Sequence, residues 1–424
     1  MTAPDTNRTI DTIWRNEAPR LIAGLTRMTH DVGHAEELAQ DALVAALEQW
    51  PMDGVPDKPG AWLMAVAKRK AIDQFRRREV FERKVAEIGR GIHEAQVITE
   101  EEILAAIDDD IPDDLLRLVF ISCHPVSSRD ARVAMTLRLL GGLTTGEIAR
   151  AFLVPEATVA QRIVRAKRTL SEAQVPFEAP TGEDREARLG SVLEVVYLIF
   201  NEGYAATAGQ DWVRPGLCED ALRLGRVLTD LAPDEPEAHG LVALMEIQSS
   251  RTHARVGPSG EPILLLEQDR SLWDALAIKR GLDSLERAES LGGSSGPYAL
   301  QAAIAACHAR ARTAAETDWR RIAALYDALA GVSPSPVVEL NRGVAYGIAF
   351  GPQAGLAIVD ALLDVPALNN YHLLPSVRGD LLAKLGRVEE ARVEFERAAS
   401  LTRNEREREL LLERAAASAK GGTR

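Results

Sequence analysis

The sequence predicts an all-α protein with two small helical domains, an acidic linker between them, and a C-terminal domain of repeated helix pairs. Three observations support this fold class. Apolar residues recur at helical spacing in most segments, the C-terminal half lacks the alternation typical of strands, and a loose repeat of about 36 residues is present near the C-terminus. The chain has 424 residues, which is too long for one compact core and suits about three domains.

A first amphipathic helix is predicted between residues 31 and 50. Its apolar residues, among them Ala35, Leu38 and Ala42, fall on one side at helical spacing. The other side is acidic and amide-bearing, and it is either a solvated surface or a surface for a basic partner. The residues of this acidic face are Glu36, Glu37, Gln40 and Asp41.

A second helix with a cationic face is predicted at residues 60–84. It follows a loop at residues 50–60 that is rich in proline and glycine, and Pro59 is suited to open it. Trp62 and Phe75 supply aromatic rings, and residues 68–84 contain eight Lys or Arg against three acids. Such a helix is either simply solvated or grips nucleic-acid phosphates beside a pocket for unstacked bases.

After this cationic helix the sequence becomes acidic. Residues 91–116 contain nine Asp or Glu and no Lys or Arg, a composition that predicts a flexible linker over residues 89–112. Helices follow at residues 113–123 and 129–140, and a second break is predicted at residues 175–186.

Residues 142–170 have the pattern of a helix-turn-helix. Thr144 can cap the first helix while Glu147 reaches back to it, and Pro155 resets the backbone before a second helix that begins near Glu156. One side of this second helix is apolar and the other basic, which suits a DNA major groove, because Arg pairs with guanine and Gln with adenine. An ordinary helical hairpin with a solvated face is the alternative. The apolar side carries Val159, Ile163, Ala166 and Leu170, and the polar side carries Thr158, Gln161, Arg162, Arg165 and Arg168.

Residues 185–424 are rich in Ala and Leu and predict stacked helix pairs of the tetratricopeptide type. Residues 376–401 give the best single unit, and residues 230–247 read as a junction between two pairs. Residues 196–211 do not fit the repeat, and we interpret them as an adapter between domains. Stacked pairs form a concave surface that suits a protein or small ligand.

Composition limits the classes of function that we expect. The net charge is −13. The three cysteines form no CxxC pair, so we expect reduced, buried thiols, no metal site and no other cofactor. Neither a signal peptide nor a long apolar run is visible, and we therefore expect a cytoplasmic protein without a membrane contact. The sequence lacks a phosphate loop, a nucleophile elbow and an HExxH motif, so an enzyme is not expected.

Taken in order, three segments resemble a bacterial sigma factor of the extracytoplasmic-function (ECF) group in the sigma-70 family. Residues 35–43, AEELAQDAL, are similar to the helix that binds the polymerase clamp, and residues 62–78, WLMAVAKRKAIDQFRRR, to the −10 element helix. Residues 142–170 are similar to the −35 reader. Residues 123–152 and 196–209 resemble the subgroup with a tetratricopeptide-like C-terminal extension.

The resemblance implies a domain layout of sigma region 2 at residues 8–88, linker at 89–112, sigma region 4 at 113–175 and extension at 185–424. It also implies core RNA polymerase and promoter DNA as partners, and a further protein or small-ligand partner for the extension. A tetratricopeptide scaffold and a conventional helix-turn-helix regulator remain alternatives. The implied site residues are Glu36, Glu37, Gln40 and Asp41 for polymerase, Trp62, Lys68, Arg69, Lys70, Arg76 and Arg77 for the −10 element, and Thr158, Gln161, Arg162, Arg165, Lys167 and Arg168 for the −35 element.

Overall fold

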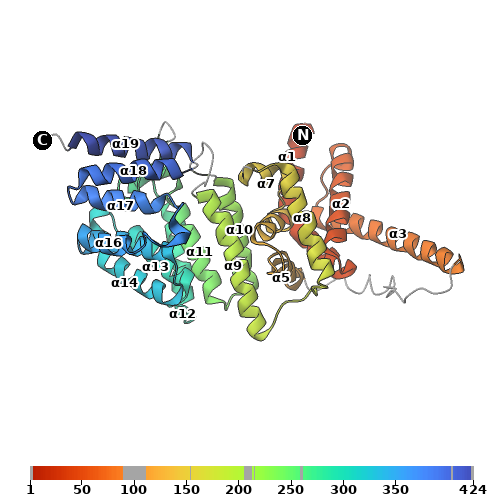
Figure 1. The fold of residues 1–424 in the computed structure, drawn as a ribbon. Helices are drawn as coiled ribbons and strands as arrows, with labels where there is room; N and C mark the ends of the chain where they lie inside the picture. Colours follow the sequence, from red (N-terminus) through yellow and green to blue (C-terminus); the bar gives the residue numbers. More distant parts are fainter. Residues whose placement is uncertain are drawn as a thin grey trace. The chain divides into compact units, whose positions relative to one another are not determined.

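The computed structural model describes residues 3–88, 111–152, 154–204, 213, 215–257, 261–402 and 404–421. Within these ranges every regular element is a helix, apart from isolated bridge residues such as the pair Val256 and Pro262, which confirms the all-α prediction (Figure 1). The contacts between residues divide the chain into two compact units, unit 1 at Met1–Val195 and unit 2 at Val196–Arg424. The predicted linker lies outside the described residues up to residue 110.

Unit 1 begins with α1 (Ala3–Thr29), α2 (Val32–Asp53) and α3 (Pro59–Ile88), which pack against one another. Asp31 caps α2 by accepting a hydrogen bond from the backbone N–H of His34 at 2.9 Å. Pro59 opens α3, as its position after the loop predicts.

The predicted loop at residues 50–60 is shorter in the structure, because α2 continues through Pro51 to Asp53. Trp50 is buried, and its ring packs edge-on against Trp62 with centroids 5.2 Å apart. This contact holds Trp50, at the start of the last turn of α2, in the core. Pro51 has no N–H, so the last turn of α2 lacks one of its backbone hydrogen bonds.

The helix-turn-helix of unit 1 is formed by α7 (Thr145–Phe152) and α8 (Glu156–Glu172), which lie together in Figure 1. The predicted cap is present: the N–H of Glu147 donates to Thr144 Oγ1 at 3.1 Å, and the N–H of Thr144 donates to Glu147 Oε2 at 2.7 Å. Pro155 occupies the cap position of α8 rather than its first helical turn, so this cap lacks a side-chain hydrogen bond. The predicted apolar side of α8 is buried: Val159, Ile163, Ala166 and Leu170.

Two further helices, α5 (Ile111–Ser122) and α6 (Arg129–Leu139), support this motif, with α6 packed against both α7 and α8. The next helix after α8 is α9 (Gly182–Tyr204), so the predicted break at residues 175–186 ends earlier than expected. In the first half of α9, Ser191 donates to the carbonyl of Cys123 at 2.6 Å and Arg188 to that of Phe120 at 3.2 Å. The boundary between the units falls inside α9, after Val195.

Unit 2 is a succession of helices, each packed against the next. The predicted unit at residues 376–401 is a helix pair, α17 (Leu373–Lys384) and α18 (Val388–Leu401), whose turn places Gly386 at φ 76°. Between α15 (Pro336–Ala349) and α16 (Pro352–Asp360) the backbones approach closely, because Gly343, Gly347 and Gly355 carry no side chains there. The helices after α9 are α10 (Pro215–Leu231), α11 (Pro236–Ser249), α12 (Ala275–Ser290), α13 (Pro297–Arg310), α14 (Trp319–Val332), α15 (Pro336–Ala349), α16 (Pro352–Asp360), α17 (Leu373–Lys384), α18 (Val388–Leu401) and α19 (Glu405–Gly421).

Three general properties of the described residues bear on function. No helix in the described part of the chain is long and apolar enough to cross a membrane. Cys123, Cys218 and Cys307 are all free and buried. Among the described residues, no group of three or more His, Cys, Asp or Glu side chains has an arrangement that could hold a metal ion.

Candidate polymerase and DNA surfaces

The acidic face of α2 is only partly exposed. Glu36 is 5% exposed, whereas Glu37, the next residue, faces solvent. Gln40 and Asp41 are half-buried, and the amide of Gln40 donates to Glu36 Oε1 at 2.6 Å. The sequence places these four side chains on one helical face, and the structure places Glu36 at the edge of that face where the core begins.

The buried carboxylate of Glu36 has two cationic partners from distant parts of unit 1. Arg138 on α6 donates through Nε to Oε1 at 2.6 Å, and the Lys167 ammonium on α8 pairs with Oε2. Burial by itself raises the pKa of Glu36, but the nearby Lys167 ammonium and Arg138 guanidinium outweigh that effect, and the pKa is lowered. Glu36 is therefore ionised at neutral pH.

On α3, the predicted −10 residues differ in exposure. Arg69 and Arg76 face solvent, whereas Lys68, Lys70 and Trp62 are half-buried. Lys70 reaches back to α2, with Nζ 3.3 Å from the carbonyl oxygen of Asp41 and 3.5 Å from its carboxylate. The side chain of Arg77 lies outside the described residues.

On α8, the polar side opposite the buried apolar row contains the predicted −35 residues. Gln161, Arg165 and Arg168 are exposed, and Thr158 is half-buried. Arg168 pairs with Glu172 one turn later on the same helix at 2.6 Å. The basic side of α8 therefore presents an amide and two guanidinium groups to solvent, which is the chemistry that DNA base edges and phosphates require.

Two of the predicted −35 residues are held by acids of unit 1. Arg162 donates through Nη2 to Asp130 of α6 at 2.7 Å, and Lys167 pairs with Glu36. Sequence reasoning did not single out Arg138 or Asp130. Both lie within residues 123–152, which resemble the subgroup with the C-terminal extension, but no local pattern assigns them a role, because each is joined to its partner by the tertiary packing of unit 1.

A second ion pair joins the first helices of unit 1 to the group around the helix-turn-helix. Arg27 on α1 lies 3.1 Å from the carboxylate of Asp114 on α5, which is buried, and α1 packs along α5. Arg117 also contacts Asp114, at 3.0 Å. Together with the pairs of Glu36, this ion pair joins α1 and α2 to α5, α6 and α8 within unit 1.

Comparison with known proteins places these helices in a family. The family model of sigma-70 region 2 matches residues 13–80, and that of sigma-70 region 4 matches residues 128–170. Over 155 residues the chain is 27% identical to the ECF RNA polymerase sigma factor SigK of Mycobacterium ulcerans (strain Agy99), a match that covers 36% of this chain and 78% of that protein. The chain belongs to the sigma-70 family and is of the ECF type.

Two further matches of this ECF sigma factor are to a family and a protein whose names state no activity. Residues 188–289 match a family of unknown function, DUF6596. An uncharacterised protein of Rhizobium meliloti (strain 1021) is 41% identical over 407 residues, which cover 93% of this chain and 92% of that protein. A long C-terminal extension of this kind is therefore shared with a relative of nearly the same extent.

Proposed function

We propose that this ECF sigma factor binds core RNA polymerase through α2 and directs it to promoters that it reads with α3 and α8. The sigma role is supported by the two family models; the residue assignments are supported by the fold. The main observation behind the residue assignments is the arrangement of α8. Its apolar row is buried on one side, while Gln161 and Arg165 face solvent on the other. In this role the protein acts where transcription takes place, in the cytoplasm, and it contributes binding energy rather than bond chemistry.

For the polymerase surface, we assign the exposed Glu37 as the first contact, with Gln40 and Asp41 beside it. Acidic side chains at the rim of such an interface set partner choice and association rate through charge complementarity. Glu36 joins this surface only if its pairs with Arg138 and Lys167 separate. The same separation releases Lys167 for DNA phosphates.

Co-purification with core polymerase tests this surface. Glu37→Arg is expected to weaken holoenzyme formation, and adding Asp41→Arg to weaken it further, although Asp41 also contacts Lys70 and its change disturbs α3. Asp53→Arg, at an exposed position near the end of the same helix, is the matched control. Normal holoenzyme with the Glu37→Arg Asp41→Arg double variant contradicts the assignment.

For promoter DNA, we assign the exposed cations of α3, Arg69 and Arg76, to the −10 region, together with Lys68, Lys70, Arg77 and the ring of Trp62. Cations on the backbone and aromatic stacking supply the binding energy for separated strands. On α8, Arg162, Gln161 and Thr158 are assigned to base edges, and Arg165, Lys167 and Arg168 to phosphates.

Substitutions on α8 separate these two roles. Arg162→Ala is expected to cost about 1–3 kcal/mol at one base position, whereas Arg165→Ala is expected to weaken all sequences alike. Binding to a set of promoter fragments that differ at single positions is the measurement. A uniform loss for Arg162→Ala contradicts its role as a base reader.

For the extension, we propose a regulatory or supporting role that acts through a protein or small-ligand partner. Helix pairs of this kind provide large surfaces for partners. A chain that ends after Tyr204 tests the role and keeps Arg188, Ser191 and Glu194, the residues of α9 that bind the segment from Phe120 to Arg129 within unit 1. A gain of run-off transcription means that the extension inhibits, and a loss means that it supports activity. If the full chain does not bind core polymerase at all, the sigma role is contradicted. The result then favours a tetratricopeptide scaffold or a conventional helix-turn-helix regulator.

A further inference from the structure

The segment between α11 and α12, residues 250–274, interrupts the helix pairs of unit 2 and contains a cluster of cations. Arg251, Arg255 and Arg270 lie against the rings of Tyr204 and Trp273. The guanidinium carbon of Arg251 is 5.8 Å from the Tyr204 centroid and 5.7 Å from that of Trp273. Rings favour a nearby cation through their electron-rich faces, but they do not accept the strong hydrogen bonds of a guanidinium group.

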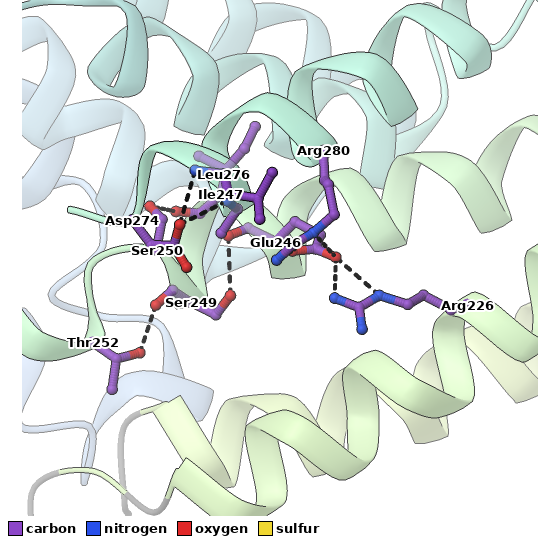
Figure 2. Close-up of polar contacts among 10 residues, drawn as sticks. Arg226, Glu246, Ile247, Ser249, Ser250, Thr252, Asp274, Leu276 and Arg280 are labelled. Atoms are coloured by element: carbon purple, nitrogen blue, oxygen red, sulfur yellow. Dashed lines mark hydrogen bonds and ion pairs between the residues drawn. The ribbon is translucent and has the colours of Figure 1, made fainter.

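A buried charge nearby shows how unit 2 normally compensates such a group. Glu246 on α11 is 1% exposed, and Figure 2 shows it between Arg226 and Arg280. Arg226 donates to Oε1 through Nε at 3.0 Å, and Arg280 donates to Oε2 through Nη2 at 3.0 Å. This acid has opposite charges and hydrogen bonds on both oxygens, which is what a buried ion requires.

Arg251, five residues later, has no such compensation. It is 6% exposed, its Nε is buried without a hydrogen bond, and its side chain forms no ion pair with a carboxylate among the described residues. The neighbouring arginines are committed to backbone carbonyls: Arg255 donates to Tyr204 at 3.0 Å, and Arg270 donates to His308 and Ala311, each at 2.6 Å. Of the three, Arg251 is the one whose side chain makes no hydrogen bond among the described residues, although Nε of Arg270 also lacks one.

Other buried donors and acceptors around Arg251 lack partners as well. Nε of Arg251, Nε of Arg270, Nε1 of Trp273 and Nδ1 of His308 are buried in the structure without a hydrogen bond. Burial and the positive charges of Arg251 and Arg270 lower the pKa of His308 to about 3, so this histidine is neutral. Buried polar groups are nearly always satisfied in folded proteins, and a group of unsatisfied ones at one place indicates a missing partner.

We propose that Arg251 is the centre of a binding site for a small oxyanion, a carboxylate or phosphate group, with Trp273 and His308 as neighbouring donors. A planar guanidinium group binds both kinds of oxyanion through two parallel hydrogen bonds. Such a ligand neutralises the charge of Arg251 and satisfies the donors around it. The site lies within unit 2 and does not depend on the role proposed for the sigma helices.

Thermal unfolding of the full chain in inorganic phosphate tests the site, with sodium chloride at equal ionic strength as the control. The unfolding midpoint is expected to rise with phosphate and then saturate, because a ligand that binds only the folded state stabilises it. Succinate in a parallel series tells a carboxylate ligand from a phosphate ligand. An equal rise in chloride overturns the proposal, since it indicates a general salt effect.

Arg251→Met and Arg251→Lys link the response to this side chain. Loss of a charged, two-pronged hydrogen bond is expected to raise the phosphate concentration needed for the half-maximal shift about tenfold or more. Without anion, Arg251→Met should leave the midpoint unchanged or higher, because an unpaired buried cation is removed. Arg287→Met, an exposed arginine of the same unit, is the control and should keep the response. A lower midpoint with an unchanged phosphate response overturns the proposal in favour of a purely structural Arg251.

One further variant tests whether the oxyanion belongs to this chain. Asp211 is the first acid after Tyr204 in the sequence and lies outside the described residues. Asp211→Asn is expected to change neither the anion-free midpoint nor the phosphate response. If instead it lowers the midpoint and enlarges the phosphate response, the carboxylate comes from the chain itself, and the proposal of a free ligand fails.

Discussion

Lys167 of α8 is paired with Glu36 of α2 within unit 1, although about 130 residues separate them in the sequence. One is a predicted DNA contact and the other a predicted polymerase contact. In this conformation the two side chains are paired with each other. Lys167 therefore cannot bind DNA, and Glu36 cannot bind polymerase, until the pair separates. Arg138 strengthens the arrangement by binding the second oxygen of the same carboxylate.

Removing the carboxylate should destabilise unit 1. Glu36→Gln leaves Arg138 and Lys167 without a countercharge, and breaking a fully buried pair costs about 3–5 kcal/mol. Both cations keep some contact with water, at 20% and 24% exposed, so we expect a smaller loss of about 2 kcal/mol in the free energy of unfolding. Denaturant titration of the full chain gives the value. Glu37→Gln, the exposed neighbour, serves as control, and equal losses for the two variants contradict this account.

The same ion pair predicts a pH dependence. The folded-state pKa of Glu36 is lowered, so the stability that it contributes is complete above the ordinary glutamate pKa of about 4.3 and is lost as the pH falls through the folded value. Wild type and Glu36→Gln should differ most at neutral pH and converge in acid. Unfolding measured at several pH values from neutral downward checks this. A difference that stays constant across the range is the contrary result.

Asp130 should restrain the −35 surface. It holds Arg162 at 2.7 Å, and Arg162 must leave this acid to reach a base. Because the pair is solvent-exposed on one side, it is worth no more than about 1 kcal/mol. Asp130→Asn is therefore expected to tighten binding of the holoenzyme to promoter DNA by up to about fivefold. Titration of labelled promoter DNA at fixed salt provides the measurement, and the gain should vanish in the Arg162→Ala background.

A close helix crossing in unit 2 should tolerate no side chain. A Cβ at Gly355 would lie 2.5 Å from the carbonyl oxygen of Gly343 and 2.7 Å from the Cα of Gly347, and backbone atoms cannot move aside as side chains do. We expect Gly355→Ala to destabilise the fold by about 1–3 kcal/mol. Gly331 in α14 has open space around its Cβ position, so Gly331→Ala should be neutral or stabilising by up to about 1 kcal/mol. Thermal unfolding of both variants is the measurement that tests this prediction.

The elements of unit 1 that depend on local chemistry could be predicted from the sequence. The cap formed by Thr144 and Glu147, the start of α3 at Pro59 and the buried row of α8 all arise from residues within one or two helical turns. The all-α class also followed from periodicity. These features are confirmed because no distant partner is needed to produce them.

The features that depend on tertiary packing could not be predicted. The period of α2 places Glu36 beside Glu37, and nothing within the helix indicates that Arg138 and Lys167 will cover one and leave the other in water. Likewise, the composition at Trp50 predicts a loop, yet contact with Trp62 keeps the helix going past Pro51. Arg251 belongs to no recognisable motif, and only its burial among unsatisfied donors distinguishes it from other arginines.

The continuity of α9 across Val195 has a practical consequence for anyone who exchanges the extension between sigma factors. Residues on both sides of that boundary share one helical register, in which each added residue turns the remainder of the helix by about 100° and advances it by about 1.5 Å. One extra residue between Ser191 and Tyr204 in a chimera therefore changes the angle between these two side chains around the helix axis by about 100°. An insertion of about seven residues, or two turns, nearly restores the angle. Fusion points within this helix should be chosen by phase rather than by length.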